Sequence, residues 1–220
     1  MISTGIGTDN IDIVLNELDA LVNVDLTKRR PLETHRSLRF LRLGTSGALQ
    51  EDLETGTPVL TKVAGGLDGL LHFYRSGGIG IPDLTRDFVH DMGWDGRLAE
   101  PYFVPASPTL SRLFDDPGVR SGITLSTPGF YAPQVRSIRL PSRDAVLLEK
   151  LAAFRYQGMK IMNFEMESSA LYALSALLGH EAVTLCVAIG NRLSTRFMKD
   201  YKVAVDELID TALHKLAGNG

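Results

Sequence analysis

The sequence has little cysteine, few basic runs and no long apolar stretch, and each of these shortages argues against a class of structure or partner. Cys186 is the only cysteine among 220 residues, so no disulfide can form within the chain and a reducing compartment is expected. No apolar run approaches the roughly 20 residues needed to span a membrane. The formal net charge is −3, and the densest basic run covers only residues 28–30. We therefore expect a cytoplasmic protein whose partners include neither nucleic acid nor a membrane.

Short apolar runs alternate with amphipathic segments along the chain, which favours an α/β fold. Apolar runs predict strands at residues 38–43, 57–63, 119–126 and 182–189. Helical periodicity predicts helices at residues 8–22, 144–156 and 200–216, and an apolar run behind possible caps predicts a helix at 168–179. Residues 76–108 are rich in glycine and proline and are expected to form a long surface excursion. The length suits one domain with helices on both faces of a sheet.

Two glutamates, Glu165 and Glu167, stand two residues apart where a short strand gives way to an apolar helix. Ser168 and Ser169 can cap that helix through their hydroxyl groups. Buried carboxylates need specific hydrogen-bond donors, and the hydroxyls of a ligand are one such partner. The alternative is that both glutamates only stabilise the helix N-terminus, where a negative charge contributes about 0.3–1 kcal/mol.

Two further segments carry groups suited to a polar ligand. Arg42 precedes residues 44–47 (GTSG) at the end of a predicted strand, which fits either a ligand crevice or a tight turn with an exposed arginine. Phe130, Gln134 and Arg136 combine an aromatic ring, an amide and a guanidinium. Such a set can hold a flat polar heterocycle by stacking and by paired hydrogen bonds.

Four motifs in a fixed order resemble those of the nucleoside phosphorylase family, with the uridine phosphorylase branch as the nearest match. They are residues 3–7 (STGIG), 42–47 (RLGTSG), 130–136 (FYAPQVR) and 163–168 (NFEMES), followed by residues 190–192 (GNR). The resemblance implies that residues 1–220 form one α/β domain, a three-layer α/β/α arrangement around a central mixed, twisted sheet. It also implies phosphorolysis, in which orthophosphate attacks C1′ of a nucleoside and releases the free base and pentose 1-phosphate.

The resemblance assigns roles to the residues that match the family's motifs. The implied phosphate-binding residues are Arg42 and Thr45, and the implied ribose-binding residues are Thr45, Met166 and Glu167. The implied base-binding residues are Phe130, Gln134, Arg136 and Arg192. Catalysis is expected to depend on Arg42, Glu167 and Arg136. Asn191 stands where the purine-specific branch has an aspartate that protonates the base, and an amide cannot act as that acid, so a pyrimidine is favoured.

The resemblance also implies a co-substrate, an assembly and a missing segment. Orthophosphate is the expected co-substrate, with no cofactor and no metal, and a homo-oligomer is expected, either a dimer or a hexamer. The family's first strand and glycine-rich phosphate loop have no counterpart before Met1, so we expect an N-terminally truncated fold in which residues 1–4 end a strand. Two other functions are alternatives: a nucleoside N-ribohydrolase of the same fold that uses water, and a non-catalytic nucleoside-binding fragment.

Overall fold

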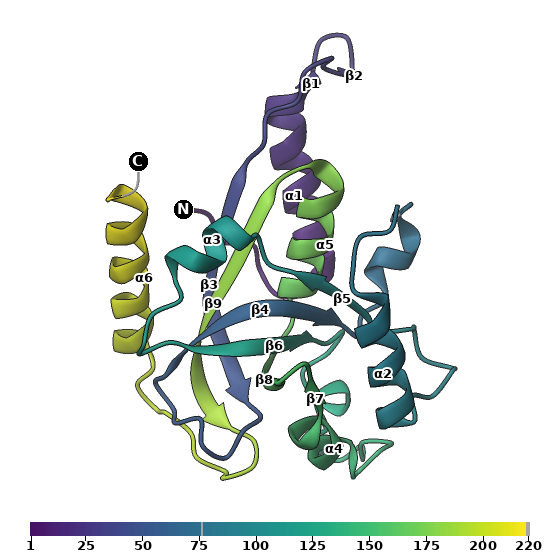
Figure 1. The fold of residues 1–220 in the computed structure, drawn as a ribbon, viewed down its shortest axis with the longest axis vertical. Coiled ribbons are helices and arrows are strands. Elements are labelled where there is room, and N and C mark those ends of the chain that lie inside the picture. Colours follow the sequence, from purple (N-terminus) through teal and green to yellow (C-terminus); the bar gives the residue numbers. More distant parts are fainter. Residues whose placement is uncertain (76, 219–220) are drawn as a thin grey trace.

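The computed structural model describes residues 1–75 and 77–218, and a mixed β-sheet forms its centre (Figure 1). The strands of this sheet are β3 (Arg39–Ala48), β4 (Pro58–Gly66), β5 (Tyr102–Pro105), β6 (Arg120–Ser126), β7 (Arg155–Tyr156), β8 (Met159–Glu165) and β9 (Glu181–Asn191). Their order is β3-β9-β4-β6-β8-β7, with β5 paired to β4. The pairs β3–β9, β4–β6 and β6–β8 are parallel, whereas β4–β9, β4–β5 and β7–β8 are antiparallel. The expected mixed sheet is therefore confirmed.

The sheet curls until β8 also pairs with β3. This antiparallel contact joins Gly47 to Phe164 and Ala48 to Asn163. It brings the glycine-containing run 44–47 beside the end of β8, where the two glutamates follow. That run was expected to follow a strand, but it lies inside β3, because β3 keeps pairing with β9 as far as Ala48.

Helices cover both faces of the sheet, as the three-layer expectation requires. The helices α1 (Thr8–Asn23), α3 (Pro108–Leu113), α5 (Ser168–Leu178) and α6 (Lys202–Ala217) bury side chains in one apolar cluster, and α2 (Pro82–Met92) and α4 (Leu147–Ala153) in another. Alternate residues of β5 separate these clusters: Tyr102 and Val104 belong to the first and Phe103 to the second. Successive side chains of a strand point to opposite faces, so the two clusters lie on opposite sides of the sheet.

Several local expectations need correction. Residues 1–4 form no strand, and α1 begins after Gly7 without a side-chain cap from Thr8, Asp9 or Asn10. The helix expected at 144–156 is limited to α4, because the chain turns into the short β7–β8 hairpin after Phe154. The basic run 28–30 covers the turn and the first residue of β2 in a small projecting hairpin formed by β1 (Val24–Asp25) and β2 (Arg30–Pro31) (Figure 1).

The described part of the segment 76–108 is not a surface excursion, and residue 76 itself lies outside the described residues. The segment forms α2 and β5 and buries Leu84, Phe88 and Phe103 completely. The reason lies in β4, where Gly65 pairs with Phe103 and Gly66 with Tyr102. A Cβ atom at Gly65 or Gly66 would lie 2.4 or 2.3 Å from these rings. The two glycines let the rings pack onto the backbone of β4, and this burial outweighs the loop-forming composition. The short 3-10 helices η1 (Leu70–Phe73) and η2 (Ala132–Gln134) complete the fold.

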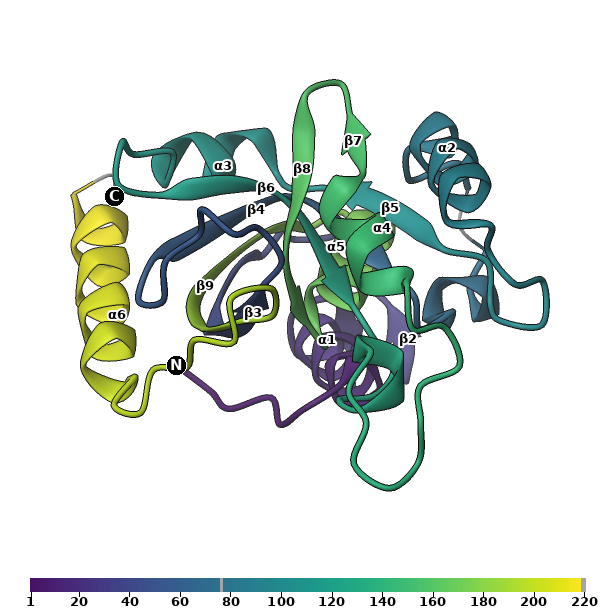
Figure 2. The same ribbon diagram turned by 90° about the horizontal axis from the view of Figure 1, so that it is seen from below.

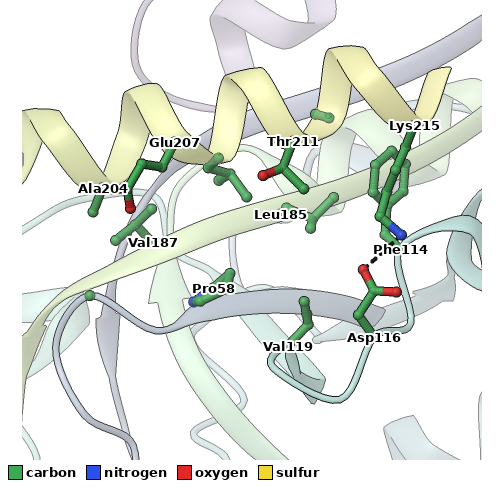
Figure 3. A pocket seen from close by; sticks show the side chains of 13 residues that line it. Pro58, Phe114, Asp116, Val119, Leu185, Val187, Ala204, Glu207, Thr211 and Lys215 are labelled. Carbon is green, nitrogen blue, oxygen red and sulfur yellow. Dashed lines mark ion pairs between the residues drawn. The ribbon is translucent and has the colours of Figure 1, made fainter. Parts of the chain in front are cut away.

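The C-terminal helix α6 packs against the side of the sheet formed by β3 and β9, away from α2 and α4 (Figure 2). Leu208 and Ala212 supply its buried contacts. Near its end, Lys215 forms an ion pair of 2.7 Å with Asp116 (Figure 3). A hollow of about 180 Å³ remains between α6 and the strands. Among the described residues, no helix combines the length and the apolar character needed to cross a membrane.

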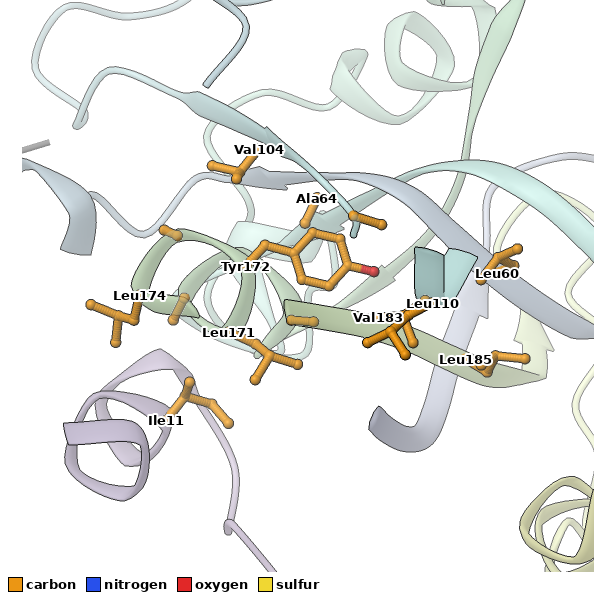
Figure 4. Close-up of a cluster of buried hydrophobic side chains, with 14 of the residues drawn as sticks. Ile11, Leu60, Ala64, Val104, Leu110, Leu171, Tyr172, Leu174, Val183 and Leu185 are labelled. Carbon is orange, nitrogen blue, oxygen red and sulfur yellow. The ribbon is translucent and has the colours of Figure 1, made fainter. Parts of the chain in front are cut away.

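Tyr172 of α5 connects the core to the strand backbones (Figure 4). Its ring is buried, and its hydroxyl donates to the Thr61 carbonyl at 2.8 Å and accepts the Thr184 N–H at 2.8 Å. Burial raises the pKa of Tyr172, so the hydroxyl stays neutral and keeps its proton for the first bond. One side chain thus joins β4, α5 and β9.

Replacing this hydroxyl should destabilise the protein without changing its core volume. We expect Tyr172→Phe to lower the free energy of unfolding by about 1–3 kcal/mol, because two buried backbone groups lose their partner. Urea denaturation measures this change. Tyr131→Phe is the matched control, since Tyr131 is 54% exposed. Equal stability of the two variants would contradict the structural role given to the Tyr172 hydroxyl.

Candidate active site

The residues expected to bind a ligand line one large cavity. Its volume is about 1120 Å³, and it lies along β3, the η2 loop, the β8–α5 junction and the end of β9. All eight expected residues contribute to its wall: Arg42, Thr45, Phe130, Gln134, Arg136, Met166, Glu167 and Arg192. Segments that are far apart in the sequence therefore meet at one place.

Arg42 lies at one end of this cavity between two carboxylates. Its Nη1 lies 3.2 Å from Glu165 Oε2, and its Nη2 donates to Glu167 Oε2. Nη1 also donates to the sulfur of Cys186 at 3.1 Å. Burial lowers the pKa of Arg42, but Cys186, Glu165 and Glu167 outweigh this effect. The pKa is therefore raised, and the guanidinium keeps its positive charge. Because its side chain is only 15% exposed, the alternative of an exposed arginine in a tight turn is wrong.

Glu165 acts as the cap of α5. Its carboxylate accepts the backbone N–H of Glu167 at 3.0 Å and that of Ser168 at 2.9 Å. It also accepts the hydroxyls of Ser126 and Ser168. The expectation that Ser168 and Ser169 cap the helix is wrong, because the Ser168 N–H and hydroxyl both donate to Glu165 and the Ser169 N–H donates to the Ser126 hydroxyl.

Glu167 faces the cavity beside Arg42. Its Oε1 accepts the Gly7 N–H at 2.7 Å, and its Oε2 accepts the Met166 N–H at 3.2 Å. Burial raises the pKa of Glu167; Arg42 opposes the shift and Glu165 adds to it, and the net direction is upward. Gly7 has a φ of 101°, and a Cβ there would lie 2.5 Å from the Asp9 carboxylate, so glycine is needed at this contact.

The other end of the cavity carries the amide and the guanidinium groups. Gln134 is buried; its Nε2 donates to Thr127 Oγ1 at 2.9 Å, and its Oε1 accepts an N–H of Arg136. The Arg136 guanidinium carbon lies 3.9 Å from the centre of the Phe130 ring, a cation–π contact. Arg192 donates to the Gln134 carbonyl at 3.1 Å. Burial and then the charge of Arg192 lower the pKa of Arg136 to about 10.

Asn191 lines the cavity, but its side-chain amide is hydrogen-bonded to backbone groups of the protein. Its Nδ2 donates to the carbonyls of Gln50 and Leu53 at 2.8 and 2.9 Å. Its Oδ1 accepts the N–H groups of Leu193 and Ser194 at 2.9 and 3.0 Å. The side chain therefore anchors the turn after β9. Within residues 1–75 and 77–218, no group of three or more histidine, cysteine, aspartate or glutamate side chains is arranged to hold a metal ion.

The backbone of β3 sets the distance between the two ends. The guanidinium of Arg42 lies against Gly44, whereas a Cβ at Gly47 would lie 3.5 Å from Arg136 and 3.6 Å from Arg192. Three residues of a strand span about 10 Å. The cavity thus offers carboxylate and guanidinium groups at one end, and an amide, two guanidiniums and an aromatic ring at the other. This arrangement suits a hydroxyl-bearing group joined to a flat polar ring.

Two contacts of the site were not foreseen from the sequence. Cys186 is buried within an apolar run, and nothing in that run indicates its contact with Arg42. Gly7 belongs to the motif of residues 3–7, although no role followed for its backbone N–H. The only hint in the sequence was a glycine just before a predicted helix, a position where a left-handed backbone conformation is common.

Comparison with known proteins gives consistent matches. Residues 1–214 match the family model described as the phosphorylase superfamily. A uridine phosphorylase from Thermococcus kodakarensis is 29% identical over 204 residues, which cover 90% of this chain and 59% of that protein. A uridine phosphorylase from Escherichia coli is 30% identical over 191 residues, which cover 86% of this chain and 62% of that protein. The chain therefore spans less than two thirds of the length of these relatives.

Solved structures of nucleoside phosphorylases have the same fold as this chain. A Trypanosoma brucei nucleoside phosphorylase that shows uridine phosphorylase activity superposes with a TM-score of 0.82 at 24% identity, covering 98% of this chain and 79% of that one. A uridine phosphorylase from Schistosoma mansoni in complex with thymine gives a TM-score of 0.66 at 21% identity, covering 98% of this chain and 71% of that one. At these identities the likeness shows the fold alone.

The two glutamates should differ in what they contribute to stability. We expect Glu165→Ala to lower the free energy of unfolding by about 3–5 kcal/mol, because it leaves buried N–H and hydroxyl donors without an acceptor and removes one partner of Arg42. Urea denaturation tests this, with Glu149→Ala as the control, since Glu149 is exposed on α4. A loss no larger than that of the control would show that Glu165 does not cap α5.

Proposed function

Because the chain belongs to the phosphorylase superfamily, we propose that it catalyses the phosphorolysis of a uridine-like pyrimidine nucleoside. The products are the free base and pentose 1-phosphate. The observation that carries the proposal is the two-ended cavity, with Arg42 and Glu167 at one end and Gln134 and Arg136 at the other. The uridine phosphorylases among its relatives support the same reaction.

At the sugar end, the proposed roles follow from charge and hydrogen-bonding capacity. The Glu167 carboxylate accepts hydrogen bonds from the ribose hydroxyls, and Met166 packs on the sugar. Arg42 and Thr45 hold the phosphate. Cleavage of a glycosidic bond passes through an oxocarbenium-like sugar, so the carboxylates near the sugar stabilise its developing positive charge. Phosphate is itself the nucleophile, and the protein supplies none.

At the base end, negative charge develops on the departing pyrimidine. Gln134 reads the ring with one acceptor and one donor, and Arg136 and Arg192 place two cations near its carbonyl oxygens. Donors aimed at such a developing charge act as an oxyanion hole. Phe130 lines the ring pocket. Asn191 supplies no acid to protonate a leaving purine, which favours a pyrimidine. We also propose that the protein acts as a homo-oligomer, a dimer or a hexamer, as the family resemblance implies.

A phosphate-dependent assay tests this function. Purified protein is incubated with uridine, thymidine, inosine or adenosine, with and without orthophosphate, and the released base is measured. We expect release of the pyrimidine bases only when phosphate is present, together with pentose 1-phosphate. Release of uracil at the same rate without phosphate would identify an N-ribohydrolase. Ligand-induced thermal stabilisation without any release would identify a non-catalytic nucleoside-binding protein.

Glu167 should set the acidic side of the activity profile. Its pKa is raised above the ordinary value of 4.5, so the carboxylate loses its charge as the pH falls through a value higher than for a free glutamate. We expect kcat/KM to fall in that range, because a protonated Glu167 is a poorer acceptor for ribose hydroxyls. Glu167→Gln should reduce kcat/KM by about 10- to 100-fold, the loss of one charged hydrogen bond, and flatten this part of the profile.

The control for this variant is its stability. Glu165 still neutralises Arg42 in Glu167→Gln, so the urea midpoint should change far less than in Glu165→Ala. Retention of the acidic fall in activity by Glu167→Gln would assign that titration to another group.

A further inference from the structure

We propose that Gly44 and Cys186 together position Arg42, so that its guanidinium keeps both carboxylates and still offers two N–H groups to an oxyanion such as orthophosphate. The inference deepens the proposed function and rests on it, because phosphorolysis needs an oxyanion at the sugar end of the cavity. Both residues act through Arg42 and are positioning residues, without a direct part in the chemical step.

The Arg42 guanidinium carries five N–H donors. A guanidinium carries its N–H groups in one rigid plane. Nη1 meets Cys186 Sγ at 3.1 Å and Glu165 Oε2 at 3.2 Å, and Nη2 donates to Glu167 Oε2. Within the described residues, Nε–H and the second N–H of Nη2 have no acceptor. Nε and Nη2 are neighbours in that plane, and two neighbouring donors match two oxygens of a phosphate.

The Arg42 side chain folds back along its own strand over Gly44. A Cβ atom at Gly44 would lie 2.9 Å from Nη1, 3.0 Å from Nη2 and 3.1 Å from Cζ of Arg42. Contacts this short are repulsive, so any larger residue would push the guanidinium away from the strand and from its carboxylates. The bare backbone at Gly44 is therefore a condition of the observed arrangement.

Cys186 stands beside Gly44 on the neighbouring parallel strand β9. The guanidinium thus rests across two strands, with Gly44 beneath it and the Cys186 sulfur as an acceptor. Burial raises the pKa of this thiol to about 12, so it accepts the hydrogen bond while remaining neutral. A third negative charge beside Glu165 and Glu167 would repel an incoming phosphate; the thiol avoids this.

Variants of Gly44 and Cys186 should therefore affect the binding of phosphate and the binding of nucleoside differently. Arg42 need not leave its carboxylates when phosphate binds, because the remaining donors are free for it. We call the contacts of Gly44 and Cys186 with the Arg42 guanidinium the cradle. Loss of the cradle should therefore weaken phosphate binding more than nucleoside binding. A merely structural role for Cys186 or Gly44 would lower stability and affect both substrates alike.

The test is steady-state kinetics with phosphate and uridine varied separately. We expect Cys186→Ala to raise the phosphate KM by about three- to tenfold, the loss of one weak hydrogen bond to a charged group, with a uridine KM changed by less than threefold. Cys186→Ser keeps an acceptor and should restore the phosphate KM to within about twofold of the wild type. Gly44→Ala should raise the phosphate KM by about tenfold or more, because it displaces the whole guanidinium.

Gly118→Ala is the matched control for the glycine variant, because a Cβ at Gly118 meets nothing within 4 Å. We expect it to match the wild type in both KM values. An unchanged phosphate KM in Cys186→Ala, or equal rises in both KM values, would overturn the proposal. If Gly44→Ala does not fold, the Cys186→Ala and Cys186→Ser pair still decides.

Calorimetric titration with inorganic phosphate alone separates this inference from the proposed function. Phosphate binding that weakens in Cys186→Ala and recovers in Cys186→Ser, in a protein that releases no base, would support the cradle and refute phosphorolysis. Release of uracil that requires phosphate, with equal phosphate affinity in all variants, would support phosphorolysis and refute the cradle. Failure of the wild type to bind phosphate would refute the cradle.

Discussion

The ion-pair cluster of Arg42, Glu165 and Glu167 is the interaction on which the site and its surroundings depend. A buried charge is costly unless it is paired and hydrogen-bonded, and here one guanidinium serves two carboxylates. Glu165 links the cluster to the start of α5, and Glu167 links it to the backbone of Gly7 at the start of α1. The cluster also depends on the curled sheet, which brings β3 and β8 together. The curl of the sheet is therefore a condition for the Arg42, Glu165 and Glu167 cluster to form.

The charges of the cavity are separated along β3. Around Arg42 two carboxylates face one guanidinium, so negative charge is in excess there. Around Gln134 two guanidiniums, Arg136 and Arg192, have no carboxylate partner among the described residues. For the proposed reaction this polarity matches the transition state, in which the sugar becomes positive and the base negative. Charges placed in advance need little reorganisation during the reaction, which is where electrostatic catalysis gains most of its effect.

Sequence reasoning succeeded where one physical signal dominated. The continuous apolar runs of β9 and α5 and the amphipathic periods of α1 and α6 predicted those elements, because burial on both faces of a sheet or along one helix face leaves a regular pattern. The gathering of Gln134, Arg136, Arg42 and Glu167 in one cavity followed from four motifs that fit one family. Their roles remain proposals.

The failures share a cause, which is pairing between segments distant in the sequence. The sequence 76–108 has the composition of a loop, yet Tyr102 and Phe103 of β5 are buried because Gly65 and Gly66 leave room for their rings. Ser168 and Ser169 look like helix caps, yet a carboxylate from the preceding strand takes that place. Cys186 resembles any buried cysteine, and only the register of β3 on β9 places it beside Arg42. None of these partners can be read from one segment alone.

The base end of the cavity is already satisfied by its own groups, and this shapes how a ligand competes for it. The Gln134 amide oxygen holds an N–H of Arg136, and the Arg136 guanidinium covers one face of Phe130. A flat ring that enters must exchange these partners for its own, so the net gain is a difference between two sets of bonds. A ring with the correct carbonyl and N–H groups replaces every bond it breaks. A ring that lacks one of them leaves a buried donor or acceptor unpaired, which costs about 1–3 kcal/mol. For the proposed function, the contacts among Gln134, Arg136 and Phe130 thus favour a base whose groups replace every bond that it displaces.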